Sequence, residues 1–388
     1  MPPIKLQIYN PSQYPRAGTL TVPWELICRK AGVPPGEVVV HDEYGNALPT
    51  QVDYAAQPCS ARATLVFSLA REVSPGPEDY SAPSSYVTVE RGRPAEPGPH
   101  PEVVKVGEPP HELRLMNEEM QIHFNLNPSP WGDGRDWYAG SATSVQIGRQ
   151  EILDTFRSIL NWLDHDPEKR CMQVDQIKMP RPPWDGAAWQ QVSLFDRPYS
   201  FVASSVGQIR AAVVIASEPF DYTYFDPVIN QSRRLKCSLH REISLCRGAD
   251  FVAEELRLRG VYDGAGAEGV SHDLLFAPRY FTYMDLGLYP SLFKPDGNSG
   301  WFAMSGAWAP HQSYGFATDA HVSSVSAPHE GFPVEKDAHK TFSWELQPVR
   351  SARCLHLFAY QKESAFLPHV GRVWYEHIYK PLKAEIAP

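Results

Sequence analysis

The stretch Arg234–Cys246, RLKCSLHREISLC, decides the fold class of this chain. Apolar and polar side chains alternate along it. The apolar set is Leu235, Cys237, Leu239, Ile243 and Leu245, and the polar set is Lys236, Ser238, His240, Glu242 and Ser244. Because successive side chains of a strand point to opposite faces, this period of two predicts an antiparallel strand with one wet face. Arg241 interrupts the apolar face, and we expect it to find a partner across the sheet.

Strands with similar patterns are predicted on both sides of this stretch. Phe251–Val261 is its natural partner. Two predicted hairpins precede it, and two further strands follow near the C-terminus. The hairpins are Leu113–Met116 with Met120–Asn125 and Ser200–Ser205 with Ile209–Ser217, and the late strands are Lys340–Leu346 and Cys354–Tyr360. The predicted fold class is therefore mainly β: a small N-terminal β-sandwich followed by a large antiparallel β-supersandwich.

A proline-rich segment divides the chain. Residues 1–72 have short strands with turns between them, and proline and glycine are dense from Ser74 to Pro110. Since proline cannot sustain a central ladder, we expect a connector there. The prediction is a small domain with its connector over residues 1–105 and a large sandwich with a sugar cleft over 106–388. One helix is expected from about Glu151 to Leu163, where apolar residues follow a three-to-four spacing.

Composition excludes several classes of protein. The formal net charge of -9 argues against a nucleic-acid partner. We expect no membrane span, because no apolar run approaches about 20 residues. The start lacks the pattern of a signal peptide, which indicates a cytoplasmic protein if that start is native. Six cysteines form no C-x-x-C pair, although a Cys28–Cys59 disulfide stays open. Without a phosphate-binding loop, no cofactor is expected.

Residues 277–321 have the composition of a polar cleft. Aromatic rings, carboxylates, imidazoles and an arginine alternate there with glycine and proline. Aromatic rings stack on the apolar faces of sugars, while arginine, aspartate and histidine bind hydroxyl groups or move protons. The alternative interpretation is an aromatic-rich sheet whose polar groups are paired with one another.

Three clusters supply the candidate site residues. The predicted substrate-binding residues are Trp131, Asp136, Trp137, Arg279, Trp308 and Tyr314, and the predicted catalytic residues are Tyr283, Asp285, His311, Asp319 and His321. A hydrolase would use two carboxylates among Asp136, Asp285 and Asp319. A uronate lyase would use a histidine or Tyr283 as its base, with Arg279 neutralising the acid. The alternative role of His311, His321 and His329 is to bind a metal, but their irregular spacing does not match a metal motif and no metal is predicted.

The N-terminal residues carry a family resemblance. The shared order is an Asn-Pro start, a V-x-D-x-x-G-x-x-x-P-x-Q core and a proline-glycine-tyrosine end. These residues are Asn10, Pro11, Val40, Asp42, Gly45, Pro49, Gln51, Pro75, Gly76 and Tyr80. This order resembles the small β-domain placed before the large sandwich of family 38-type α-mannosidases. The stretch LRLMNEEMQIHFN is similar to the opening of that sandwich, which has the galactose-mutarotase-like superfold. The resemblance implies a fold, and no mannosidase site residue is carried over, since the catalytic α/β domain of those enzymes would lie before this chain.

These observations predict a carbohydrate-active enzyme that cleaves a glycosidic bond in an oligo- or polysaccharide. Hydrolase and lyase chemistry both stay open, and sugar epimerisation is a third possibility. The alternative from another class is a non-catalytic carbohydrate-binding or structural protein, which would need no coupled acid and base. The sequence also leaves a homo-oligomer open.

Overall fold

The protein is built almost entirely from antiparallel sheets. The computed structural model describes residues 3–31, 34–55, 62–94, 101–127, 139–152, 173–180, 189–194, 197–226, 230–262, 271–283, 291–295, 300–306, 312–326 and 341–388. Within these ranges every strand pairing is antiparallel, which confirms the predicted mainly β fold class. The helix predicted from about Glu151 to Leu163 lies outside the described residues, except for its first two positions. Cys28 carries a free thiol, and Cys59 is outside the described residues.

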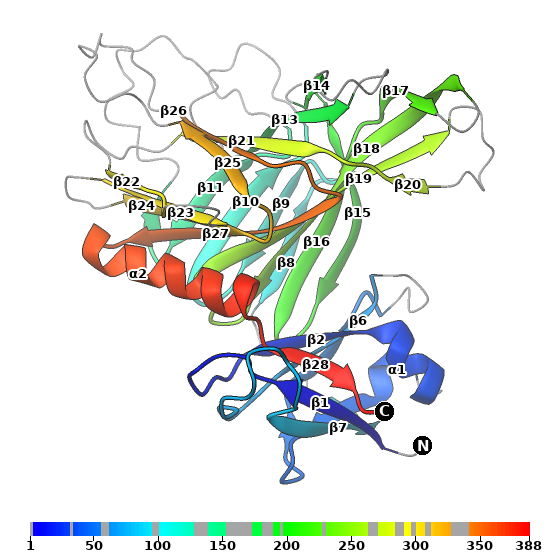
Figure 1. Cartoon of the computed structure of the whole chain (residues 1–388), viewed down its shortest axis with the longest axis vertical. Helices are drawn as coiled ribbons and strands as arrows, with labels where there is room; N and C mark the ends of the chain where they lie inside the picture. Colours follow the sequence, from blue (N-terminus) through cyan, green and yellow to red (C-terminus); the bar gives the residue numbers. More distant parts are fainter. Residues whose placement is uncertain are drawn as a thin grey trace.

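The N-terminal residues form a small lobe of two sheets and a helix (Figure 1). The first sheet has the order β28 (Lys383–Ile386), β1 (Ile4–Tyr9), β7 (Ser85–Arg91), β3 (Val38–His41) and β4 (Ala47–Leu48). The second has the order β2 (Thr19–Pro23), β6 (Thr64–Ser68) and β5 (Thr50–Asp53). The last strand of the chain thus pairs with the first. The predicted division between residues 105 and 106 stays a prediction.

A short helix, α1 (Trp24–Ala31), packs on the small lobe's core. Trp24 and Ile27 are buried there. Glu25 lies in the first turn and Arg29 and Lys30 in the last, so the charges complement the helix dipole. A 3-10 turn over Pro35–Glu37 then leads into β3.

In its described residues the large lobe contains three sheets. One has the order β12 (Gln150–Glu151), β11 (Ala142–Ile147), β10 (Met120–Asn125), β9 (Glu112–Met116) and β8 (Glu102–Val106). A second has the order β14 (Trp189–Ser193), β13 (Gln173–Pro180), β21 (Ala277–Tyr283), β26 (Thr341–Leu346) and β25 (Val322–Ser326). The largest sheet has the order β15 (Tyr199–Val206), β16 (Arg210–Ser217), β18 (Gln231–Cys246), β19 (Phe251–Tyr262), β27 (Ser351–Tyr360), β24 (Gln312–Thr318), β23 (Trp301–Ser305) and β22 (Ser291–Phe293). Two further strands pair beside this path: β17 (Phe220–Asp226) pairs with β18, and β20 (Ser271–Asp273) pairs with β19.

The three sheets share one apolar core, and strand alternation decides which side chains enter it. Leu239, Ile243 and Leu256 point inward from the largest sheet and are fully buried with Ile122 and Trp344 from the other two sheets. The predicted pairing of the decisive stretch with its partner is confirmed, because β18 and β19 run antiparallel over their length. Both predicted hairpins are confirmed as β9–β10 and β15–β16.

The outer face of the largest sheet has two covers. The helix α2 (Glu363–Trp374) lies over β23, β24 and β27 (Figure 1). Its approach to β24 is close, since a Cβ on Gly315 would lie 2.5 Å from Val370. A π-helical turn, Tyr375–Tyr379, then leads toward the small lobe. The small lobe is the second cover of this face, because its Tyr54 packs against Ala212 and Val214 of β16. Among the described residues, no helix is long and apolar enough to cross a membrane.

Candidate functional site

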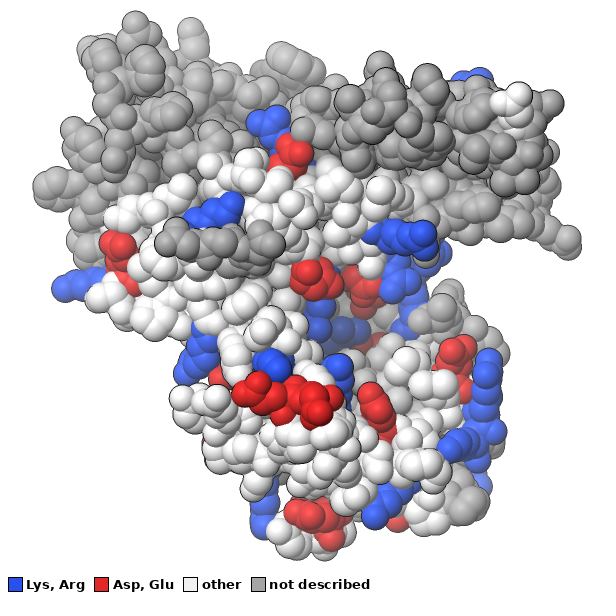
Figure 2. Space-filling view, in the orientation of Figure 1, with Lys and Arg blue, Asp and Glu red and all other residues white. Residues whose placement is uncertain are grey.

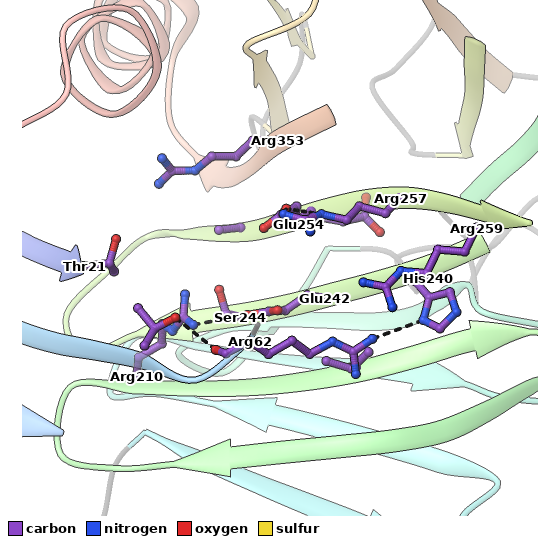
Figure 3. A pocket seen from close by; sticks show the side chains of 14 residues that line it. Thr21, Arg62, Arg210, His240, Glu242, Ser244, Glu254, Arg257, Arg259 and Arg353 are labelled. Atoms are coloured by element: carbon purple, nitrogen blue, oxygen red, sulfur yellow. Dashed lines mark hydrogen bonds and ion pairs between the residues drawn. The ribbon is translucent and has the colours of Figure 1, made fainter. Parts of the chain in front are cut away.

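A cavity of about 290 Å³ opens between the small lobe and the outer face of the largest sheet. Figure 2 shows this hollow between the two lobes, with basic and acidic side chains around it. We call it the interlobe cleft. Its lining residues come from both lobes, and they are Thr21, Arg62, Thr64, Arg210, Val214, His240, Glu242, Ser244, Ala253, Glu254, Glu255, Arg257, Arg259 and Arg353. Figure 3 shows their side chains.

Strand alternation brings the polar groups into the cleft. The even-numbered positions of β18 face outward, among them His240 and Glu242, while their odd-numbered neighbours enter the core. On β19 the phase is reversed, so Glu255, Arg257 and Arg259 face outward. The wet face predicted for β18 is therefore the floor of the cleft, covered by the small lobe rather than by open solvent.

Two of the cleft arginines are neutralised by carboxylates. Arg210 lies 2.5 Å from Asp53 and 3.2 Å from Glu242. Asp53 comes from β5 of the small lobe and is fully buried, so this pair joins the lobes. Arg257 lies 2.6 Å from Glu255. These arginines hold Glu242 and Glu255 in place at the floor of the cleft.

The remaining arginines of the cleft have no such partner among the described side chains. Among the side chains that the structure describes, no carboxylate forms an ion pair with Arg62, Arg259 or Arg353. Asp273 is opposite Arg259 in the β19–β20 ladder, and its side chain lies outside the described part. Arg62 lies 3.2 Å from His240, and the buried Nε of Arg259 has no hydrogen-bond partner in the described part of the chain. Burial lowers the pKa of Arg62, and the charge of Arg259 lowers it further. Burial and Arg210 also lower the pKa of Arg353. This arrangement favours an anion.

Two carboxylates face each other on the floor of the cleft. Glu242 and Glu255 are directly opposite in the β18–β19 ladder. Such positions share a face and have Cβ atoms about 4.5–5.5 Å apart. Burial raises the pKa of Glu242. Arg210 opposes this rise, whereas Glu255 adds to it. One member of the pair is thereby biased toward its protonated form, as proton transfer requires.

The residues predicted from the sequence do not gather into one described site. Tyr314 is fully buried in the core, and Arg279 lies opposite Glu345 in the β21–β26 ladder. Asp319 accepts a hydrogen bond from the backbone N–H of Arg353 at 2.9 Å, which places it beside the interlobe cleft, and burial raises its pKa. The buried Nδ1 of His321 has no hydrogen-bond partner among the described residues.

The other predicted site residues cannot be placed by their side chains. Tyr283 ends β21, but its side chain lies outside the described part. Six further predicted residues lie entirely outside the described part: Trp131, Asp136, Trp137, Asp285, Trp308 and His311. Their assigned roles stay predictions. His329, the third histidine of the weak metal pattern, is also outside the described residues, and the described residues contain no group of three metal-ligating side chains suited to an ion.

A second polar cluster is enclosed in the core. Glu254 accepts hydrogen bonds from Arg241 at 2.6 Å and from the Tyr280 hydroxyl at 2.8 Å. His356 lies 3.2 Å from Glu254 and 2.8 Å from the hydroxyl of Tyr314. All five side chains are at most 3% exposed. Their mutual pairing indicates a structural network, in agreement with the interpretation of an aromatic-rich sheet with paired polar groups.

Most residues of the interlobe cleft carry no sequence signal of function. The alternation of β18 predicts an outward face for His240 and Glu242 but not what covers that face. Arg62 precedes β6, and Arg353 lies on β27 near the C-terminus. Only the paired register of β18 and β19 could have suggested that Glu242 and Glu255 meet, since it follows from the predicted pairing of these two strands.

Comparisons with known proteins find similarity in structure but not in sequence. No family model matches the chain, and no curated protein matches it. An α-mannosidase from Enterococcus faecalis aligns with TM-score 0.45 and 10% identity, over 100% of this chain and 46% of its own. A protein of glycosyl hydrolase family 38 from the same organism gives 0.46 and 10%, over 100% and 47%. A 4-alpha-glucanotransferase from Thermococcus litoralis gives 0.35 and 10%, over 67% and 39%.

This chain therefore spans less than half the length of those solved structures. With TM-scores below 0.5, the similarities assign no activity to it. The candidate function rests on the geometry of the interlobe cleft.

Proposed function

We propose that this protein is a carbohydrate-active enzyme that hydrolyses a glycosidic bond in the interlobe cleft. Glu242 is the general acid, and Glu255 is the nucleophile or base. The observation that carries the proposal is the direct opposition of these two carboxylates on the floor of a cleft. Glycoside hydrolysis uses such a pair of carboxyl groups, one protonated and one ionised.

The surroundings of Glu242 support its role as the acid. Its side chain is 22% exposed, so it is reachable from the cleft and yet largely shielded from water. A pKa raised by burial increases the fraction that carries a proton near neutral pH. Arg62 and Arg210 limit this rise and would stabilise the carboxylate left behind after proton donation.

Glu255 has the complementary surroundings. Its side chain is 40% exposed, and Arg257 holds it by an ion pair on the same strand. An attack on the anomeric carbon or on water requires a carboxylate that is held in position. Thr21 and Thr64 from the small lobe and Ser244 from β18 offer hydroxyl groups to the same cavity, and these suit the hydroxyl groups of a sugar.

The test is hydrolysis of an oligo- and polysaccharide panel, with reducing ends and the ultraviolet absorbance of unsaturated uronates followed together. We expect new reducing ends without absorbance. Glu242→Gln should lower kcat by roughly 10²- to 10⁴-fold, the usual contribution of a positioned acid. The matched control is Glu43→Gln in the exposed turn before β4, which should keep wild-type kcat.

Three outcomes contradict the proposal. Wild-type activity in both Glu242→Gln and Glu255→Gln removes the assigned roles. A rise of absorbance that matches the reducing ends indicates lyase chemistry instead. Saccharide binding without any product across the panel indicates the non-catalytic binding protein.

A further inference from the structure

We infer that the saccharide taken by the interlobe cleft is acidic, and that its carboxylate or sulfate group lies between Arg62 and Arg259. This inference rests on the proposed function for the sugar, but its anion site stands on separate residues. The two arginines come from different lobes, Arg62 from the segment before β6 and Arg259 from β19.

The two guanidinium groups converge on one end of the cleft. Figure 3 shows both directed toward the same space beside His240. The charge of Arg259 lowers the pKa of Arg62, so the two cations are close enough to repel each other. Two like charges held together in a partly buried place are unfavourable unless an anion lies between them.

Hydrogen-bonding capacity is left over at this end. The buried Nε of Arg259 donates to no group in the described part of the chain. Arg62 is bonded to an imidazole rather than to a carboxylate. Guanidinium groups present paired N–H donors whose geometry matches the two oxygens of a carboxylate or a sulfate.

The rest of the cleft distinguishes an acidic sugar from a bare anion or a nucleic acid. Glu255 adds negative charge next to the arginines, and Thr21 and Thr64 add hydroxyl groups to the lining. This mixture would repel a polyanion but fits a ligand with one acidic group and several hydroxyl groups. The chain's formal net charge of -9 likewise disfavours nucleic acid. The volume of about 290 Å³ is at the lower end for small-molecule sites.

The experiment is calorimetric titration of the whole chain with matched sugars. The acidic probes are glucuronate, galacturonate and glucose 6-sulfate, and the neutral probes are glucose and galactose. We expect the acidic probes to bind at least tenfold more tightly, with affinity falling as salt rises. Arg62→Met and Arg259→Met should each weaken acidic-sugar binding roughly 10- to 100-fold, the effect of losing a charge-assisted hydrogen bond.

Controls separate the anion site from folding and from catalysis. Arg29→Met, on the exposed face of α1, should bind like the wild type, and Arg259→Lys should retain part of the affinity. Unchanged melting temperatures would show that the methionine variants fold. Glu242→Gln should still bind the acidic sugars. Binding of acidic sugars by the wild-type protein without any hydrolysis would remove the proposed reaction but leave this inference intact.

The inference is overturned if neutral sugars bind as tightly as acidic ones, or if both methionine variants bind acidic sugars like the wild type. It is also overturned if inorganic sulfate alone binds as tightly as glucose 6-sulfate, because the site would then recognise a free anion. Hydrolysis of neutral substrates only would keep the proposed reaction and remove the acidic specificity.

Discussion

Arg241 and Glu254 form a buried ion pair between β18 and β19, with 2.6 Å between Nε and Oε1. Their sequence neighbours Glu242 and Glu255 are the carboxylates of the interlobe cleft. Because adjacent residues of a strand point to opposite faces, one pair of strands holds a structural ion pair below the sheet and a candidate catalytic pair above it. The buried pair fixes the strands on which the cleft pair depends.

Removing one partner of this ion pair should destabilise the protein strongly. Arg241→Met leaves the charge of Glu254 buried, and a cost of about 3–5 kcal/mol in the free energy of unfolding is expected. Denaturant unfolding measures it. The matched control is Arg29→Met, whose pair with Glu25 is exposed and should contribute at most about 1 kcal/mol. Equal stabilities of the two variants would show that the buried pair is dispensable.

The stability of the fold should fall on acidification in two steps. Burial lowers the pKa of His377 to about 4 from 6.5. The unfolded state therefore binds this proton first, and stability is lost between pH 6.5 and 4. Burial alone would raise the pKa of Glu254, but Arg241 and His356 outweigh it and lower the pKa from 4.5 to about 2. That contribution is present above pH 4.5 and lost from there toward pH 2.

Unfolding curves from pH 7 to pH 2 measure both steps. His377→Gln should flatten the upper step and leave the lower one. A stability that stays constant between pH 6.5 and 4 in the wild type would contradict the assignment to His377.

Alternating side chains in the sequence predict a strand and its buried face. They do not predict which distant segment of the chain covers the other face. Alternation along Arg234–Cys246 predicted the strand, its buried face and a cross-sheet partner for Arg241, which is Glu254. It could not predict the small lobe as a cover, because a period of two identifies a face but not its neighbour. Arg62 and Arg353 lie far apart in the chain and meet the cleft only through tertiary packing.

The aromatic stretch over residues 277–321 shows that composition alone also cannot predict a cleft. Its composition suited a sugar cleft, yet Tyr280 and Tyr314 are fully buried and their hydroxyl groups bond to Glu254 and His356. Composition does not distinguish a polar cleft from a core whose polar groups are all satisfied. Only the partners of each hydroxyl group do so.

The junction between the lobes should depend on Asp53. This buried carboxylate holds Arg210 at 2.5 Å and accepts a hydrogen bond from Gln51 at 2.6 Å. Asp53→Asn removes the negative charge and leaves Arg210 paired with Glu242 alone, so we expect a loss of about 2–4 kcal/mol and weaker docking of the small lobe. Calorimetry and limited proteolysis measure the two effects. Asp79→Asn, in an exposed turn, is the control. Indistinguishable melting of the two variants would exclude a role for Asp53 in docking.

The geometry of the carboxylate pair predicts the stereochemistry of hydrolysis. Opposite ladder positions place Cβ atoms about 4.5–5.5 Å apart on one face, so the carboxyl groups of Glu242 and Glu255 can approach each other to a similar separation. Retaining enzymes keep their carboxyl groups about 5–5.5 Å apart, whereas inverting enzymes need about 6.5–9.5 Å for a water. We therefore expect the first product to keep the anomeric configuration of the substrate. Nuclear magnetic resonance at early times measures it, and inversion would mean that Glu242 and Glu255 are not the reacting pair.

The last strand should stabilise the lobe in which the chain begins. In the β1–β28 ladder Leu6 lies opposite Ile386 and Ile8 opposite Ala384, and both C-terminal residues pack on the small lobe's core. Deleting residues 383–388 exposes the edge of β1, so we expect a loss of about 1–3 kcal/mol and a tendency to aggregate. Thermal unfolding and light scattering measure these effects, and deletion of Pro388 alone is the control. Because Arg16 still donates to the carbonyl of Lys380 at 2.7 Å, the shortened chain should keep its π-helical turn. Unchanged stability would mean that β28 pairs with β1 without stabilising the small lobe.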